Sequence, residues 1–359
     1  MPKQIKYADA GVDRVLRAES KKALQILRKT HRFSRYGKVM QLPYGKLVPI
    51  GKNRYLDFQI EGVGTKVLVA QLAEKYDTIG IDGVAMAVND VIRSGARPFA
   101  LVDNIHAQIS NPKLTNEWIK GITQGAVKSE CVVPGGEIGD VADVIRGISE
   151  GRGFDMIVAA LGDVDEERVI LGNKIKANDA IIGLRSSGIH SNGVSLARKI
   201  LFKQWGGKYE PDEIPEELDT EIALEVLRPT EIYVKPLLKV ASAVRIKAAV
   251  HITGDAYGKF DRLTQFSRGV GFRFDNFNPH PIFGLIKKTA MQLGCAITDE
   301  EMYRTFNMGW GFAVIVDKED ADDTLDSLEK IKMPAERIGT VTQTGRIEIH
   351  NEDQRIILK

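Results

Sequence analysis

Residues 58–90 read FQIEGVGTKVLVAQLAEKYDTIGIDGVAMAVND and carry the features from which the fold can be predicted. Apolar and aromatic residues before position 61 predict a strand, and Gly62 and Gly64 predict a turn directly after it. Glycine lets backbone amides approach an anion, while Thr65 and Lys66 add a hydroxyl and an ammonium group. The pattern predicts either a phosphate-binding turn or a plain tight turn with an exposed lysine. It does not have the spacing of a nucleotide P-loop.

Oxygen-bearing side chains follow this turn at Asp82, Asn89 and Asp90, inside a predicted helix over 82–93. Such ligands suit Mg²⁺, which proteins usually bind together with the phosphates of a substrate. Taken singly, each residue is better explained as a helix cap or a polar helix end. Together with the glycine turn, they predict a site for a metal-bound phosphate.

The length of 359 residues favours two domains, and we expect them to span 1–167 and 168–359, on either side of an acidic linker. Hydrophobic residues make up 43% and charged residues 27%, as in globular proteins. A net charge of +2 does not predict nucleic-acid binding.

Two cysteines far apart, Cys131 and Cys295, argue against a disulfide framework or a zinc site. The chain has no signal-peptide pattern and no apolar run long enough to span a membrane. We therefore expect a cytoplasmic protein that does not bind a membrane.

The first residues, 7–13, are mostly small and precede a predicted helix over 15–29. Gly11 would permit close approach to a ligand, so this segment is either a loose end or a flap over a bound molecule. Further on, a strand beginning at Pro98 is expected to end near Asp103 and His106, although His106 is better explained as a structural histidine. A second strand is expected to run from Cys131 into Gly135-Gly136-Glu137.

The second half contains a strand over 179–184, a polar glycine loop over 186–193 and a helix over 194–202. A glycine loop at the start of a helix is suited to bind an anion, because unpaired amides and the helix dipole point at the same place. An ordinary turn capped by Ser191 or Asn192 is the alternative. The run from His251 through Thr253 and Gly254 repeats this pattern before a predicted helix over 259–266.

Taken together, these motifs resemble the phosphoribosylformylglycinamidine cyclo-ligase (aminoimidazole ribonucleotide synthetase) family over nearly the whole chain. The matching segments are Ala-Gly-Val-Asp at 10–13, Gly-Val-Gly-Thr-Lys at 62–66, the run at 80–90, Gly-Gly-Glu at 135–137, the loop at 186–193, Pro-Thr-Glu-Ile-Tyr-Val-Lys at 229–235 and Glu-Met-Tyr-Arg-Thr-Phe-Asn-Met-Gly at 301–309. Three positions depart from the family pattern. Glu61 replaces the usual Asp, Ile138-Gly-Asp-Val follows the Gly-Gly-Glu motif, and Asp255-Ala256 replaces a pair of glycines.

The resemblance implies an α/β fold of the α+β type with two domains. The N-terminal domain would pair with its copy in a homodimer to form an inter-subunit β-barrel, and the C-terminal domain would be a mixed sheet with packed helices. It also implies the reaction: cyclisation of formylglycinamidine ribonucleotide to 5-aminoimidazole ribonucleotide in purine biosynthesis, with ATP and Mg²⁺ as cofactors and ADP and phosphate as products.

The resemblance and the motifs together predict the site residues. The candidates for catalysis are Lys66, His190 and His251. Those for ATP binding are Gly11, Gly62, Gly64, Thr65, Lys66, Asp103, Gly136 and Glu137. Those for the substrate and its phosphate are Ser186, Ser187, Gly188, His190, Ser191, Asn192, Thr253 and Gly254. Those for the metal are Glu61, Asp82 and Asp90.

Related families fit less well. Selenophosphate synthetases carry a reactive cysteine or selenocysteine near the start, hydrogenase-maturation enzymes end in a modified cysteine, and thiamine-phosphate kinases lack the segment found here at 301–307. The amidotransferase of the preceding purine step is about twice as long. A non-catalytic nucleotide-binding relative stays open as an alternative, because of Glu61 and Asp255.

Overall fold

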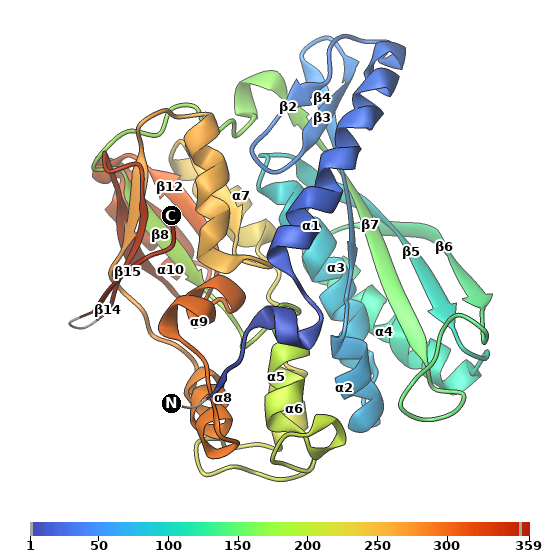
Figure 1. Cartoon of the computed structure of the whole chain (residues 1–359). Coiled ribbons are helices and arrows are strands. Elements are labelled where there is room, and N and C mark those ends of the chain that lie inside the picture. The colour runs from blue at the N-terminus through green and yellow to red at the C-terminus, as the bar shows by residue number, and fades with distance from the viewer. Residues whose placement is uncertain (1–2, 352–353) are drawn as a thin grey trace.

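The computed structural model describes residues 3–351 and 354–359 and has two sheet-containing parts that lie side by side (Figure 1). The N-terminal part is built on six strands in the order β2-β3-β4-β7-β5-β6. Their bounds are Met40–Gln41, Lys46–Gly51, Arg54–Gly62, Phe154–Asp165, Arg97–Ala107 and Val132–Asp140. The helices of this part are α2 (Lys66–Leu72), α3 (Asp77–Ile92) and α4 (Pro112–Ser129).

Helix α3 packs on strands β4, β5 and β7 and is covered in turn by α4. Of its sixteen residues only Asp77 and Ile81 are not buried, so its polar residues Asp82, Asn89 and Asp90 are buried together with its many apolar ones. The opposite face of the sheet carries exposed apolar side chains, among them Phe58, Ile60, Phe99 and Val102. An exposed apolar face of this kind marks a surface for association.

The C-terminal part is built on seven strands in the order β15-β14-β10-β13-β8-β12-β9. In chain order these are β8 (Ala180–Arg185), β9 (Ala248–His251), β10 (Gly271–Phe274), β12 (Trp310–Val316), β13 (Ala335–Thr342), β14 (Ile347–Asn351) and β15 (Gln354–Ile357). The sheet is mixed, because β10 and β14 are parallel while the other pairs are antiparallel. The mixed α/β architecture expected from the sequence is confirmed. No closed barrel forms among the described residues of this single chain.

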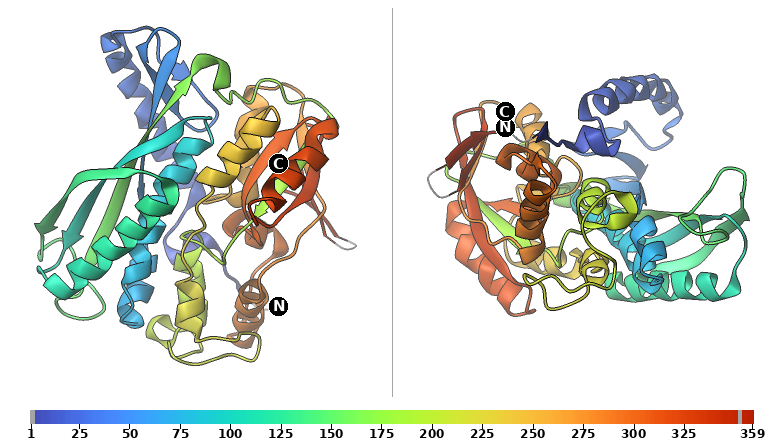
Figure 2. Two further views of the ribbon diagram at one scale, coloured as in Figure 1. Left: turned by 180° about the vertical axis from the view of Figure 1, so that it is seen from behind. Right: turned by 60° about the horizontal axis from the view of Figure 1, so that its bottom comes forward.

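Helices surround this sheet, with α7 packed against α10 (Figure 2). The α-helices of this part are α5 (Val194–Leu201), α6 (Ile222–Val226), α7 (Val234–Ala243), α8 (Pro281–Gln292), α9 (Asp299–Thr305) and α10 (Ala321–Glu329). Shorter 3-10 segments are η3 (Glu166–Arg168), η4 (Lys203–Trp205), η5 (Ala256–Gln265) and η6 (Lys318–Asp320). The helix expected over 259–266 is thus a 3-10 segment that begins earlier.

The N-terminal segment crosses to the C-terminal part. Its strand β1 (Lys3–Gln4) pairs in parallel with β11 (Cys295–Ala296). It continues through η1 (Tyr7–Ala10), α1 (Arg14–Ser20) and η2 (Lys21–Phe33). The helix expected over 15–29 is α-helical only as far as Ser20 and continues directly as the 3-10 segment η2. The proposed division at 167 and 168 separates the two sheets but not this crossing segment.

Two strand ends also lie elsewhere than expected. Strand β5 continues to Ala107, so Asp103 and His106 lie within it. The glycine pair Gly135-Gly136 lies inside β6, where it faces β5. A Cβ at Gly136 would lie 2.3 Å from a carboxylate oxygen of Asp103, so a larger residue here would displace the Asp103 side chain. Among the described residues, no helix is both long and apolar enough to cross a membrane.

The contact between α3 and α4 gives a first prediction. A Cβ at Gly80 would lie 2.3 Å from the backbone nitrogen of Ile122 and 2.5 Å from the carbonyl oxygen of Trp118. We expect Gly80→Ala to lower the free energy of unfolding by about 1–3 kcal/mol, because two helix backbones would have to separate. Urea denaturation measures this change.

Gly284→Ala is the matched control. Gly284 lies within α8, and a Cβ there would meet no atom within 4 Å. This variant should be stabilised by about 0.5–1 kcal/mol, because alanine is the better helix former. Equal effects of the two substitutions would contradict the packing described here.

Candidate active site

A buried ion pair joins the glycine turn to the rest of the molecule. Lys66 is the first residue of α2, and its side chain is fully buried. Its Nζ lies 2.8 Å from Oδ2 of Asp82 and donates a hydrogen bond of 2.7 Å to the carbonyl oxygen of Arg228. Burial lowers the pKa of Lys66, and the Asp82 carboxylate opposes this shift. The ammonium group thereby connects the two sheet-containing parts.

The Asp82 carboxylate is occupied by donors from the C-terminal part. Oδ1 accepts hydrogen bonds from Thr230 N (2.8 Å), Thr230 Oγ1 (2.6 Å) and Ser191 Oγ (3.2 Å). In this arrangement, Lys66 does not point at an open phosphate site and Asp82 is not free to bind a metal. Their assigned roles in phosphate and metal binding stay predictions. The geometry itself supports a role in holding the segment from Arg228 onward.

Further polar contacts extend this junction between the two parts. Asn89 donates to the carbonyl oxygen of Glu231 and accepts from the backbone N–H of Tyr233, each at 2.8 Å. The hydroxyl groups of Thr65 and Ser195 lie 2.7 Å apart. Residues that the sequence placed in one motif thus reach two separate segments of the C-terminal part, 191–195 and 228–233.

Asp90 forms the centre of a second cluster. Its Oδ1 lies 2.8 Å from Nδ1 of His251, and its Oδ2 lies 2.9 Å from Nη1 of Arg93. Burial alone would raise the pKa of Asp90, but Arg93 and His251 outweigh it and hold this pKa well below its usual range. Asp90 is therefore an anion at neutral pH.

Glu61 and Lys259 complete this cluster. Burial, with repulsion from Asp90, raises the pKa of Glu61 to about 7. Burial lowers the pKa of Lys259 to about 8, against the attraction of Asp90. Lys259 Nζ donates to the carbonyl oxygen of His251 at 3.1 Å and also bonds Thr253 Oγ1. Two acids and two cations are thus gathered beside the glycine turn.

Sequence reasoning missed Arg93 and Lys259. The ion-pair spacing of Asp90 and Arg93, three residues apart on a helix, could have identified the first. Nothing local identifies Lys259, because only the fold brings it to Glu61.

Among the residues described, no three His, Cys, Asp or Glu side chains form a ready metal site. Within this cluster of described residues, Glu61 forms no ion pair at contact distance but shares a hydrogen bond with Asp90, and its metal-binding role stays a prediction.

His190 is buried and adopts a left-handed backbone conformation, with φ of 65°. Its Nε2 accepts from the backbone N–H of Ser187 at 3.1 Å, which places the proton of the neutral ring on Nδ1. Burial, with repulsion from His251 and Lys66, lowers the pKa of His190 well below 6.5. This geometry favours a role in shaping the loop. Its proton-transfer role stays a prediction.

His251 has the geometry of a base. Its Nδ1 bonds Asp90, and its Nε2 is buried without a hydrogen-bond partner. A carboxylate on Nδ1 fixes the tautomer and leaves the lone pair on Nε2, as in other histidine bases. Burial lowers the pKa of His251, although Asp90 opposes the shift. His251 is therefore the better placed of the two histidines to accept a proton.

The loop over 186–193 opens on two different sides. Ser186 and Ser187 line a cleft beside α7. Asn192 lies instead near Gly254, where a Cβ would be 3.3 Å from Asn192 Oδ1 and 3.9 Å from Arg17 Nη1. Of the predicted substrate residues, Asn192 therefore lies beside Gly254, whereas the Ser191 side chain bonds Asp82 in the buried junction. Ser186 and Ser187 lie at the cleft instead.

Asn307 holds this loop in shape, a role that the sequence did not reveal. Its Nδ2 donates to the carbonyl oxygens of Gly188 (2.8 Å) and Ile189 (3.1 Å), and its Oδ1 accepts from Ser186 Oγ at 3.1 Å. At the end of the loop, Gly193 caps α5 with φ of 80°.

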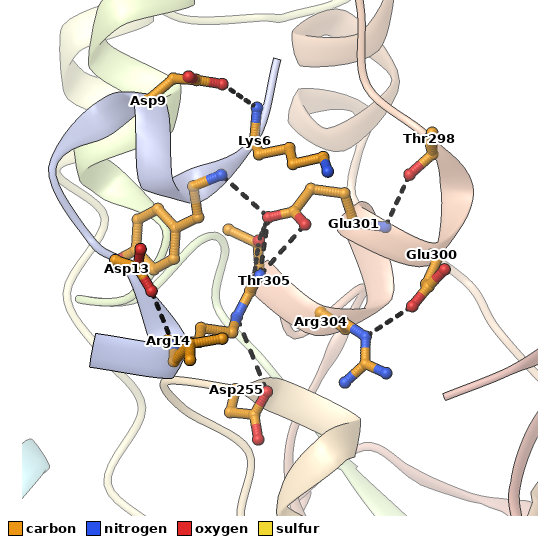
Figure 3. Close-up of polar contacts among 12 residues, drawn as sticks. Lys6, Asp9, Asp13, Arg14, Asp255, Thr298, Glu300, Glu301, Arg304 and Thr305 are labelled. Carbon is orange, nitrogen blue, oxygen red and sulfur yellow. Dashed lines mark hydrogen bonds and ion pairs between the residues drawn. The ribbon is translucent and has the colours of Figure 1, made fainter. Parts of the chain in front are cut away.

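The N-terminal segment lies against α9 and η5 (Figure 3). Arg14 Nη1 bonds Glu301 at 3.0 Å, and its Nε lies 3.7 Å from Asp255 Oδ1. The Tyr7 hydroxyl contacts the backbone of Gly193, and burial raises the pKa of Tyr7. The segment that carries Gly11 thus covers the start of α5, where the sequence predicted an anion-binding site. Arg14 also supplies the positive charge that Asp255 needs.

Asp103, Gly136 and Glu137 lie elsewhere. Gly62 pairs with Ile157 of β7, which pairs with Asn104, which in turn pairs with Glu137. Three strand spacings, about 14 Å, therefore separate Glu137 from Gly62 in one chain. Within a single chain, these three residues do not lie beside the glycine turn. Their ATP-binding role stays a prediction.

The buried pair gives the second prediction. Lys66→Met leaves the Asp82 carboxylate buried without its cation, so we expect the free energy of unfolding to fall by about 3–5 kcal/mol. The double variant Lys66→Met/Asp82→Asn should recover part of this loss, because no unpaired charge stays buried. Chemical denaturation of both variants measures the difference.

Lys75→Met is the matched control, since Lys75 pairs with Asp77 on the surface at 2.9 Å. Loss of this exposed pair should change stability by less than about 1 kcal/mol. Similar losses for Lys66→Met and Lys75→Met would contradict the role given to the buried pair.

Solved structures of other proteins have a similar fold. The hydrogenase maturation protein HypE of E. coli matches with a TM-score of 0.57 and 15% identity over 85% of each chain. PurL of T. maritima, solved in complex with ADP, matches with a TM-score of 0.57 and 14% identity over 91% of this chain and 46% of its own. At these identities, the likeness concerns the fold alone.

Comparison with sequences is more specific. Residues 45–164 match the family described as AIR synthase related protein, N-terminal domain, and residues 176–351 match its C-terminal domain. The phosphoribosylformylglycinamidine cyclo-ligase of Pyrococcus furiosus is 38% identical over 98% of this chain and 99% of its own. That of Methanocaldococcus jannaschii is also 38% identical, over 99% and 100%. The chain belongs to the phosphoribosylformylglycinamidine cyclo-ligase family.

Proposed function

We propose that this protein catalyses the ATP-dependent cyclisation of formylglycinamidine ribonucleotide to 5-aminoimidazole ribonucleotide. The observation that carries the proposal is the 38% identity to cyclo-ligases over essentially the whole of both chains. The two cysteines are free, as in a reducing compartment, and we place the enzyme in the cytoplasm.

The reaction joins phosphoryl transfer to ring closure. The γ-phosphoryl group of ATP activates the formyl oxygen, a nitrogen of the substrate attacks the activated carbon, and phosphate leaves. Phosphoryl transfer needs positioning and neutralisation of charge more than covalent help from the protein. A cluster of fixed charges beside a glycine turn suits this requirement.

ATP would lie with its phosphates against the glycine turn. The backbone at Gly62 and Gly64 and the hydroxyl of Thr65 would position the phosphates, while Lys259 and Arg93 supply positive charge. Glu61 would hold Mg²⁺ together with phosphate oxygens, and the ion would neutralise the transferred group. Residues 1–167 would then form the ATP-binding and dimerisation domain.

The substrate would bind mainly to residues 168–359. Its phosphate would lie among Asn192, Gly254 and Arg17, where a loop and a guanidinium group converge. The attacking nitrogen must lose a proton, and His251 Nε2 is a buried base without a partner that could accept it. Asp90 would orient the ring and stabilise the imidazolium that forms.

A homodimer would complete the ATP site. The uncovered face of the N-terminal sheet exposes Phe58 (54%) and Ile60 (68%), which one chain alone leaves in water. Two such sheets packed face to face would close a β-barrel and bury both faces. Asp103, Gly136 and Glu137 of one subunit would then approach the glycine turn of the other.

The third prediction is the activity. Purified protein incubated with formylglycinamidine ribonucleotide, ATP and Mg²⁺ should form aminoimidazole ribonucleotide and one ADP for each product molecule. A coupled assay for ADP, with chromatography for the product, measures both. ATP binding without product over a range of temperature and salt would reject the assignment.

The fourth prediction is the oligomeric state. Light scattering at micromolar concentration should give twice the chain mass of 39.7 kDa. Phe58→Glu/Ile60→Glu should give a monomer, because charges would be buried in the interface. Val127→Glu is a matched control, since Val127 is 71% exposed on α4, away from this sheet face. A wild-type monomer would refute the dimer.

A further inference from the structure

A large cleft lies on the side of the molecule that the proposed reaction does not use. It has a volume of about 760 Å³, within the range of small-molecule sites. Its walls come from the end of α4, the end of β8, helix α7 and the turn after α10. Seen from behind, α7 stands between α4 and α10 (Figure 2, left). Both sheet-containing parts contribute to this cleft.

The lining of the cleft is strongly basic. Its five cations face one acid, Glu231, and they are Lys128, Arg185, Lys235, Lys239 and Lys332. The whole chain is almost neutral, with 50 basic and 48 acidic residues, so this excess of positive charge is local. A cleft with one sign of charge and partly apolar walls attracts ligands of the opposite sign.

Within the described part of the chain, two of these cations already have acidic partners and two do not. Lys128 pairs with Glu231, and Lys235 pairs with Glu130 at 3.2 Å. Among the described residues, no acidic side chain lies within ion-pair distance of Lys239 or Lys332, so these two ammonium groups are available to a ligand. The hydroxyl groups of Ser186, Ser187 and Ser242 add neutral hydrogen-bonding groups.

Arg185 is held in position at the end of β8. Its guanidinium lies over the ring of Trp310, 5.6 Å from the centroid, and donates to the carbonyl oxygen of Asn278. A fixed guanidinium is suited to bind phosphate oxygens in a defined direction.

The rest of the cleft is apolar. Ile232, Pro236 and Leu238 come from α7 and the residues just before it, and Ile331, Met333 and Pro334 come from the turn after α10. Apolar side chains from two separate segments provide surfaces for a flat ring, whereas inorganic phosphate would not use them. The lining therefore matches a molecule with a phosphate at one end and a ring at the other.

We infer that this cleft is a second binding site, separate from the proposed ATP site, for a phosphate ester that carries a ring, of the size of a nucleoside monophosphate. The cations bind the phosphate, and the apolar walls hold the ring. Two sources share this chemistry in part: a free nucleotide and the phosphorylated substrate of the proposed reaction. The experiment must distinguish them.

The cleft shares a wall with the buried junction. The segment over 228–233 borders the cleft at Glu231 and Ile232. The same segment receives Lys66 at Arg228, Asp82 at Thr230 and Asn89 at Glu231 and Tyr233. A ligand in the cleft thus contacts residues that join the two parts of the molecule.

Isothermal titration calorimetry tests the inference on the full-length protein, with AMP as the probe. A saturating non-hydrolysable ATP analogue is present throughout, so the ATP site is filled. We expect saturable binding of AMP, with inorganic phosphate and adenosine each roughly tenfold weaker or more. Absence of AMP binding overturns the site, and phosphate that binds as tightly as AMP overturns its assignment to a ring-bearing ligand.

Charge reversal identifies the location. Lys239→Glu/Lys332→Glu should weaken AMP binding by roughly tenfold or more, because two phosphate-facing cations become anions. Lys174→Glu/Lys318→Glu makes the same change in charge at exposed lysines outside the cleft and should bind AMP as the wild type does. Equal binding by both double variants overturns the proposal.

Steady-state kinetics separates the two sources of ligand. Lys239→Glu/Lys332→Glu should keep the wild-type kcat and the wild-type KM for formylglycinamidine ribonucleotide. A KM raised tenfold or more in this variant would mean that the substrate itself occupies the cleft, which overturns a second site. The calorimetric result does not require activity, so its failure is distinguishable from failure of the proposed reaction.

Discussion

The ion pair between Lys66 and Asp82 is the interaction on which the arrangement of the two parts depends. Both side chains are fully buried, and a buried charge without a partner is costly. Arg228, Thr230 and Ser191 from the C-terminal part add hydrogen bonds to Lys66 Nζ and Asp82 Oδ1. The N-terminal part therefore supplies the ion pair, and the C-terminal part supplies its hydrogen-bond partners. These contacts fix the glycine turn against the loop over 186–193.

The departures from the family pattern are explained by their neighbours in space. Asp255 lies 3.7 Å from Arg14 of the N-terminal segment, so its charge is balanced. Asp255 and Ala256 have positive φ, of 71° and 37°, a conformation that glycine adopts more easily and that accounts for the glycines usual at these positions. Near Glu61, positive charge comes from Lys259 in η5, the segment that begins at Ala256. The acidic residues at these positions therefore have basic side chains near them, and the site stays charged.

The loop over 186–193 separates two surfaces with different chemistry. Towards the N-terminal segment, it presents Asn192 beside Gly254, next to a cluster of paired acids and cations. Towards α7, it presents Ser186 and Ser187 to a cleft with an excess of lysine. His190 and Asn307 fix the backbone between these surfaces, so both depend on the same buried hydrogen bonds.

The sequence alone determined the family, the alternation of strands and helices and the glycine turn. These follow from local spacing, because apolar periodicity and glycine act over a few residues. The tertiary structure alone decided that Lys66 meets Asp82, that Lys259 joins Glu61, and that Glu137 lies three strands from the turn. Such contacts join positions as much as two hundred residues apart, where pairing depends on burial and chain path, and no local pattern encodes them.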